Sequence, residues 1–286
     1  MTVFGTIGVF VRNIALPSGE IAFFRALLAA ALIGGYLLVT KRRITLHGVG
    51  RELILLVVSG VAIGFNWILL FEAYSYTTVS VATLSYYFAP VIVTVLSPLL
   101  FRERITVRGW ICFAASTVGI VLITGLGDLS EGSSHLVGIL YGLGAASLYA
   151  AVILLNKSIR SIGGIERTFL QFLAAIPVMA IYVLIDGGFR IATLTTDGWI
   201  YLAIVGILHT GVTYCLYFTA IPHLSGGECA LLSYVDPLVA VILSVTLLGE
   251  GMSWQQWLGG ALILGFTLWN ELPPIGKRKR KTGIDN

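Results

Sequence analysis

Residues 82–90 read ATLSYYFAP and residues 230–237 read ALLSYVDP. Shifting the chain by 147 residues places Tyr87 on Tyr234 and Pro90 on Pro237 without a gap. Other pairs that match at the same shift are Gly64 and Gly211, Phe71 and Phe218, Leu84 and Leu231, Glu103 and Glu250, and Trp110 and Trp257. The chain is therefore an internal duplication, and a duplicated apolar unit predicts a site between the two copies.

The composition is that of a chain immersed in lipid. Of the 286 residues, 57% are hydrophobic and 11% are charged, and the mean hydropathy is +0.93. A soluble domain carries roughly 25% charged residues, so this chain has too few charges to cover a water-facing surface. The basic residues behind the net charge of +4 lie in short loops and a tail. This position indicates that they face anionic lipid headgroups rather than nucleic acid.

Ten apolar stretches are suited to crossing a hydrocarbon core as helices. They are predicted at residues 1–16, 19–39, 53–74, 78–101, 108–125, 136–156, 165–185, 198–219, 226–248 and 254–272. We expect an all-α integral membrane protein with five-helix units at 1–125 and 136–272 and a basic tail at 273–286. Because the sixth helix begins near Leu136, the first helix is short by comparison, and we expect either a truncated helix or a start upstream of Met1.

Basic residues are distributed unevenly between the predicted loops. Of the 18 Lys and Arg residues, 15 fall on one side of the helices, together with both termini. Positive loops face the cytoplasm, so both termini are predicted to be cytoplasmic in a multi-pass protein of the inner membrane. Each unit holds an odd number of helices, so the second unit is expected to be inverted relative to the first.

Residues typical of catalytic and metal sites are not grouped in the sequence. The three cysteines, Cys112, Cys215 and Cys229, are scattered, which predicts neither a disulfide framework nor a metal site. No nucleophile–base set or phosphate loop is evident, so we expect neither enzyme activity nor a cofactor. Glu228 is expected to cap the ninth helix, and Glu103 and Glu250 to anchor helix ends near the headgroups.

Two prolines lie near the middle of the fourth and ninth predicted helices. Pro90 and Pro237 each remove a backbone donor and displace the carbonyl four residues earlier. Those carbonyls belong to Tyr86 and Ser233, and a freed acceptor at this depth must face protein or a wet cavity. These helices are therefore predicted to line a central cavity, the alternative being bends that serve packing alone.

Asp236 is an acidic residue in the middle of the ninth predicted helix, and its repeat mate is Ala89. An unpaired carboxylate at the bilayer centre costs about 2.5–3.5 kcal/mol on insertion scales. Asp236 is therefore expected either to stay protonated, which suits proton coupling, or to face water and bind a cationic group. The alternative is a structural carboxyl that is hydrogen bonded to a neighbouring helix.

Polar and aromatic residues of the third, fourth, eighth and ninth helices are the candidate substrate-binding residues. Trp67 and Tyr214 are repeat mates, and with nearby tyrosines they predict an aromatic-walled site for an organic cation or a zwitterion. His209 is a candidate for a proton path or, alternatively, for a single interhelical hydrogen bond. The complete predicted set is Asn66, Trp67, Tyr86, Tyr87, His209, Tyr214, Tyr217, Tyr234 and Asp236.

Arg25 and Glu72 are both predicted toward the outer side of the membrane. Their repeat mates, Gln171 and Thr219, are neutral, so a charged pair in one copy stands against a neutral pair in the other. The pattern predicts an Arg25–Glu72 salt bridge that either closes the outer end or is a static structural pair.

Over its whole length the sequence resembles EamA-type proteins of the drug/metabolite transporter superfamily. The resemblance rests on the twin five-helix units, on the stretch from Ala82 to Glu103 and on its second copy from Ala230 to Glu250. It implies secondary transport, often export, of amino acids or other small metabolites, although a fold alone does not fix a substrate. The expected partners are a small-molecule substrate, the lipid bilayer, a proton as coupling ion and a second copy of the chain. The alternatives are a multidrug or organic-cation efflux carrier, a static channel or a lipid-acting membrane enzyme.

Overall fold

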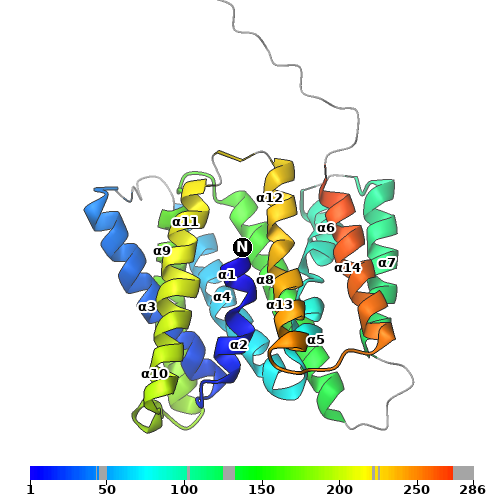
Figure 1. Cartoon of the computed structure of the whole chain (residues 1–286). Coiled ribbons are helices and arrows are strands. Elements are labelled where there is room, and N and C mark those ends of the chain that lie inside the picture. The colour runs from blue at the N-terminus through cyan, green and yellow to red at the C-terminus, as the bar shows by residue number, and fades with distance from the viewer. Residues whose placement is uncertain are drawn as a thin grey trace, which may run out of the picture.

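The computed structural model describes residues 1–42, 44, 50–101, 104–124, 133–220, 223–224 and 226–272. Within these residues every regular element is helical, and the long helices lie side by side (Figure 1). The elements are α1 (Thr2–Gly5), α2 (Ile7–Arg12), α3 (Ser18–Val39), α4 (Gly50–Tyr76), α5 (Val79–Tyr86), α6 (Ala89–Phe101), α7 (Val107–Thr124), α8 (Ser133–Ser158), α9 (Gly164–Ile185), η1 (Ile191–Thr193), α10 (Thr196–Ala203), η2 (Ile204–Val212), α11 (Thr213–Ala220), α12 (Gly226–Ser233), α13 (Val235–Thr246) and α14 (Trp254–Glu271).

Seven helical stretches are long and apolar enough to cross a membrane. They are Ser18–Val39, Gly50–Tyr76, Val79–Phe101, Val107–Thr124, Ser134–Ser158, Gly164–Ile185 and Thr196–Ala220. The shorter apolar helices Thr2–Arg12 and Leu231–Thr246 coincide with the first and ninth predicted helices, and α14 coincides with the tenth. The all-helical fold class is confirmed, and the helix ends lie within a few residues of the predicted ones.

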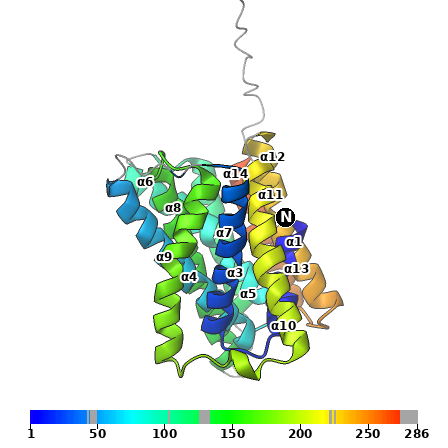
Figure 2. The ribbon, with the colours of Figure 1, turned by 90° about the vertical axis from the view of Figure 1, so that its left-hand side faces the viewer.

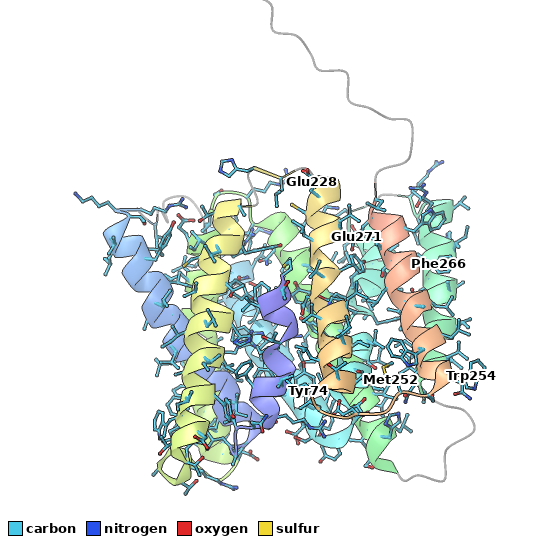
Figure 3. All side chains as sticks on the ribbon, in the orientation of Figure 1. Tyr74, Glu228, Met252, Trp254, Phe266 and Glu271 are labelled. Carbon is cyan, nitrogen blue, oxygen red and sulfur yellow. The ribbon has the colours of Figure 1, made fainter. Side chains whose placement is uncertain are left out.

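The two ends of the molecule are defined by α14. Glu271 ends this helix and lies near the same end as Glu228, whereas Met252, Trp254 and Tyr74 lie toward the opposite end (Figure 3). These are called the Glu271 end and the Trp254 end below. The chain begins at mid-height between them, and α1 and α2 run toward the Trp254 end beside α10 and α13 (Figures 1 and 2).

Two of the predicted membrane helices are broken near their middle. The break between α5 and α6 lies at Tyr87, and the break between α12 and α13 lies at its repeat mate Tyr234. Pro90 and Pro237 follow each break by three residues, where a proline removes a backbone donor. The expected distortion is therefore present in both copies and at equivalent positions.

Glycines allow several helices to approach closely. A Cβ atom added to Gly119 of α7 would meet the carbonyl of Gly259 in α14 at 2.7 Å, and a Cβ atom at Gly259 would reach the Gly119 carbonyl in return. Small residues at a crossing are the usual packing device of membrane helices, because lipid gives apolar side chains little reason to associate. The α7–α14 pair thus forms one flank of the molecule, while α4 packs against α8 and α9 at its centre.

The eighth predicted helix contains a π-helix that the sequence did not indicate. It spans Ile204–Val212 as η2 and is flanked by α10 and α11. Side chains reinforce the wider turn, since the Thr210 hydroxyl donates to the Val205 carbonyl at 2.9 Å. Such turns occur frequently at functional sites.

Candidate functional site

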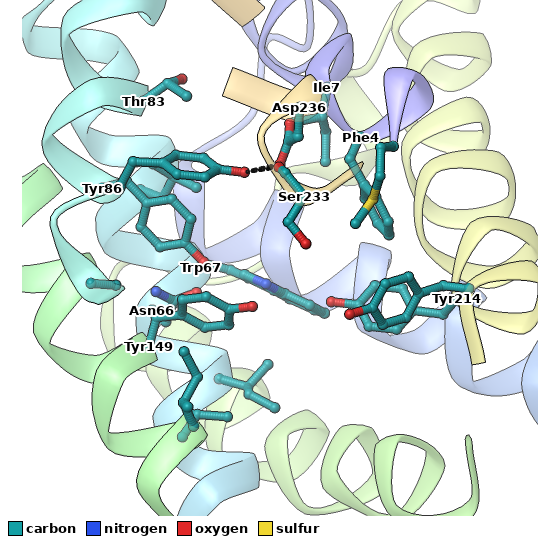
Figure 4. A pocket seen from close by; sticks show the side chains of 18 of the residues that line it. Phe4, Ile7, Asn66, Trp67, Thr83, Tyr86, Tyr149, Tyr214, Ser233 and Asp236 are labelled. Carbon is teal, nitrogen blue, oxygen red and sulfur yellow. Dashed lines mark hydrogen bonds between the residues drawn. The ribbon is translucent and has the colours of Figure 1, made fainter. Parts of the chain in front are cut away.

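A cavity of about 500 Å³ lies between the broken helices and α1, α3, α4, α8, α9 and α11. Figure 4 shows part of the open space of this cavity, which lies between Asp236, Trp67, Tyr149 and Tyr214. Eight of the nine predicted substrate-binding residues line this cavity, namely Asn66, Trp67, Tyr86, Tyr87, Tyr214, Tyr217, Tyr234 and Asp236.

A hydrogen bond to Asp236 joins the two halves at their breaks. The Tyr87 hydroxyl lies 2.7 Å from Asp236 Oδ2, where it donates its hydrogen. The same hydroxyl lies 3.3 Å from the carbonyl of Ser233, which is the acceptor that Pro237 was expected to displace. Asp236 thus has a neutral donor from the first half of the chain, and within the described part of the chain no hydrogen bond to its other oxygen is seen.

Amide side chains in the wall are fixed by neighbouring helices. Asn66 of α4 donates to the Ala145 carbonyl of α8 at 2.6 Å. Gln171 of α9 donates to Ser59 Oγ at 2.6 Å and to Asn156 Oδ1 at 2.8 Å. These bonds satisfy polar groups that would be costly if buried alone, and they hold the amides in place against α4 and α8.

Much of the remaining wall is aromatic. Trp67 lies 5.2 Å from Phe172 between ring centroids, and Phe172 lies 5.7 Å from Tyr214, both edge to face. Phe4 and Tyr149, which sequence reasoning did not select, also line the cavity. Their register could have revealed them, because residues 4–6 align with residues 149–151 at a shift of 145 and so occupy equivalent places in the two copies.

Arg25 faces the cavity rather than Glu72. Its Nε donates to Thr210 Oγ1 at 2.7 Å, and its guanidinium carbon lies 4.0 Å from the Trp67 ring centroid. Glu72 lines a second hollow at the Trp254 end, together with Asp186. The predicted Arg25–Glu72 salt bridge is therefore absent from this structure, because α3 directs Arg25 toward η2 and α4 presents Trp67 to it.

His209 is the predicted binding residue that does not line the cavity. It is buried in η2, with Nε2 2.6 Å from Thr6 Oγ1 and Nδ1 3.1 Å from the Ile204 carbonyl. The π-helix turns its ring toward the first helical segment. His209 thus lies outside the cavity lining, and its geometry is that of the interhelical hydrogen bond considered as the alternative.

Glu250 joins the halves at the Trp254 end instead of anchoring a helix at the headgroups. It pairs with Arg12, accepts a hydrogen bond from Ser244 and accepts the backbone N–H of Val79 at 2.8 Å. Gly249, with φ of +67°, provides the turn that brings Glu250 back over α13. Its repeat mate, Glu103, lies outside the described residues.

Glu228 lies in the first turn of α12, as expected for an acid at a helix start. Among the described residues, no group of three or more His, Cys, Asp or Glu side chains could hold a metal ion.

Comparison with known proteins gives matches along almost the whole chain. The model of the EamA-like transporter family matches residues 1–125 and again residues 136–270. The uncharacterized transporter YxxF of Bacillus subtilis (strain 168) is 31% identical over 268 residues, which cover 92% of this chain and 84% of that protein. An uncharacterized transporter of Archaeoglobus fulgidus is 28% identical over 273 residues, covering 93% of this chain and 92% of that protein.

One further relative and one solved structure also align over most of the chain. Protein PecM of Dickeya dadantii (strain 3937) is 29% identical over 260 residues, covering 90% of this chain and 85% of that protein. A solved crystal structure of a protein aligns with a TM-score of 0.62 at 17% identity, covering 93% of this chain and 92% of the other. At that identity the alignment supports the fold alone.

Proposed function

The chain belongs to the EamA-like transporter family, and on that premise we propose that it is a secondary active transporter of a small organic metabolite. The substrate is an amino acid, an amine or a similar compound, and it is exported across the cytoplasmic membrane by alternating access. The observation that carries the proposal is the cavity between the two halves, with Asp236 bonded across them to Tyr87. Its relatives are named transporters rather than enzymes.

An inverted repeat of ten crossings is supported by matching contacts at opposite ends. Arg12, from the first helical segment, meets Glu250 at the Trp254 end. Lys157, its mate in the second copy, donates to Ser97 at 3.1 Å near the end of α6. Ser97 is the repeat mate of Ser244, which bonds Glu250, the partner of Arg12. The corresponding basic residues therefore meet corresponding parts of the other half at opposite ends, as an inverted repeat requires.

The observed conformation is closed at the Trp254 end. Glu250 accepts the N–H of Val79, and Ser244 Oγ accepts the N–H of Ser80 at 3.2 Å, so the first turn of α5 is fixed to the end of α13. The cavity lining extends toward the Glu271 end as far as Arg167 and Glu271. Lys41 and Arg42 follow the end of α3, and Lys157 lies in the last turn of α8, both at the Glu271 end (Figure 1), so we assign that end to the cytoplasm.

Asp236 is given the central role in this mechanism. Its carboxyl either binds a cationic group of the substrate or carries the coupling proton, and both roles need access from the cavity. Separation of α5 from α13 would open the cavity to the other side, while closure near Arg167 and Glu271 would seal the first.

A ligand screen followed by transport tests the proposal. Amino acids, polyamines and quaternary amines are added to purified protein, because a ligand that binds the native state raises its melting temperature. Compounds that do so are then offered to proteoliposomes with and without a pH gradient. We expect saturable, gradient-dependent transport that Asp236→Asn abolishes and that the control Asp197→Asn, outside the cavity lining, preserves. Wild-type vesicles that move none of the compounds would reject the proposal.

A further inference from the structure

Two opposite charges face the same cavity without forming an ion pair. Arg25 of α3 and Asp236 of α13 both line it. Among the described residues, no carboxylate lies within 4.0 Å of the Arg25 guanidinium, and no basic group lies within that distance of the Asp236 carboxylate. The space between them is thus bounded by a positive and a negative group.

The Arg25 guanidinium is held firmly but has donors to spare. Its side chain is buried, and it stacks over Trp67 with Phe71 at 5.4 Å on the same side of α4. Of its five N–H donors, one is used within the described residues, in the bond from Nε to Thr210. Glu20, on the same helix, accepts the backbone N–H of Arg190 instead.

A buried guanidinium without an anion is costly, and a stacked aromatic ring offsets that cost only in part. Arg25 is therefore prepared for an anionic group that arrives with a ligand. An Arg fork suits a carboxylate in particular, because its parallel donors match the two oxygens.

Other charges around the cavity are directed elsewhere or lie at its margin. Arg167 donates to the carbonyls of Asn156 and Ile159 at the end of α8, and Glu271 lies at the end of α14. Of the charged side chains among the described residues that line the cavity, Arg25 and Asp236 remain.

We propose that the cavity is specific for zwitterions, with Arg25 binding the carboxylate and Asp236 the ammonium group of the substrate. This inference rests on the proposed transport function and narrows its substrate class. A ligand with a positive charge alone would leave Arg25 unpaired and be repelled by it. A ligand with a negative charge alone would leave Asp236 unpaired and be repelled by its carboxylate. The aromatic wall of Trp67, Phe172 and Tyr214 accommodates an apolar body. Arg25 thereby excludes the plain organic cations that Asp236 alone would admit.

Three compounds that share one skeleton separate the roles of Arg25 and Asp236. Phenylalanine carries both charges, phenethylamine lacks its carboxylate, and 3-phenylpropionate lacks its ammonium group. Leucine, isoamylamine and 4-methylpentanoate form a matched aliphatic series. Binding of all six to the purified full-length chain is measured by thermal shift and by titration calorimetry. In the wild type we expect the zwitterion of at least one series to bind roughly tenfold to hundredfold more tightly than its amine and its acid, as expected for a lost hydrogen bond to a charged group.

Variants of Arg25 and of Asp236 should each lose a different one of the two preferences. Arg25→Gln imitates the repeat mate Gln171 and should lose the preference for the zwitterion over the amine, whereas Arg25→Lys should keep part of it. Asp236→Asn should lose the preference for the zwitterion over the acid. Arg42→Gln, which removes an exposed arginine outside the cavity, should bind like the wild type.

The outcomes distinguish this inference from the proposed function. An amine that binds the wild type as tightly as its zwitterion overturns the inference, and so does an Arg25→Gln variant with unchanged preference, even if the chain transports that compound. Absence of binding by all six compounds overturns it also. The proposed function itself fails only if wild-type vesicles move no compound of the wider screen.

Discussion

Tyr87 and Tyr234 occupy the same position in the two copies, but only one of them bonds across the cavity. Tyr87 donates to Asp236, whereas the buried Tyr234 hydroxyl has no hydrogen-bond partner in the described residues. We expect Tyr87→Phe to weaken substrate binding or transport by about tenfold or more, because a hydrogen bond to a charged group contributes roughly 1.5–3 kcal/mol. Tyr234→Phe is the matched control and should change the same quantity less than about threefold. Equal losses in both variants, measured by titration calorimetry and vesicle transport, would show that the Asp236 bond is not the reason.

At this scale the sequence predicted which residues line the cavity better than it predicted their pairing. Intramembrane polar and aromatic residues face the bundle interior because lipid excludes them, and eight of the nine chosen residues line the cavity. The prediction of an Arg25–Glu72 salt bridge was wrong, because opposite charges on two helices do not determine how each helix is rotated about its axis. His209 lies outside the cavity for a related reason, because the π-helix that turns its ring toward Thr6 depends on tertiary packing.

Helix positions could be predicted closely because membrane thickness sets their length and proline marks their breaks. The π-helix of Ile204–Val212 could not be predicted from the sequence. Its wider turns are stabilised by tertiary contacts, such as the hydrogen bond between Arg25 and Thr210. The contacts of Glu250 could not be predicted either. Its position after a helix end suggested an anchor at the headgroups, whereas the folded chain brings the backbone N–H of Val79 to its carboxylate.

The contact between α1 and α13 depends on a glycine at the cavity edge. A Cβ atom at Gly5 would lie 2.7 Å from Val239 Cβ and would also meet the Asp236 carbonyl. We expect Gly5→Ala to lower stability by roughly 1–3 kcal/mol, the usual cost of overpacking, and to weaken ligand binding by moving α13. Gly35→Ala is the control, because nothing lies within 4 Å of its added atom and alanine favours a helix by roughly 0.5–1 kcal/mol. Thermal denaturation in detergent checks both, and a Gly5→Ala variant as stable as Gly35→Ala would refute the close packing.

On the scale of the whole molecule, Glu250 joins α2, α5 and α13 at the Trp254 end. In the proposed mechanism these contacts keep that end closed. Loss of Glu250 should favour opening at the Trp254 end. In a variant with Ser233→Cys as its single thiol, we expect Glu250→Ala to raise the rate of labelling by an impermeant maleimide from that side by about tenfold. That factor corresponds to roughly 1.4 kcal/mol of lost closure.

Glu166→Ala removes the partner of Arg42 in an exposed pair, and such pairs contribute about 0–1 kcal/mol. This control should leave the labelling rate unchanged. A rate that is likewise unchanged in Glu250→Ala would mean that the Glu250 contacts do not control access.

Alternation of access is tested most directly by locking the closed end and asking which side still reaches the cavity. Ser80→Cys and Ser244→Cys replace residues in contact between α5 and α13, and Ser233→Cys reports on the cavity, in a chain freed of Cys112, Cys215 and Cys229. Before the first pair is oxidised, the reporter should react with an impermeant maleimide from both sides of the membrane. After oxidation it should react from the Glu271 side alone, and reduction should restore both. Labelling from the Trp254 side that persists in the locked protein, or that never occurs in the unlocked one, would contradict alternating access.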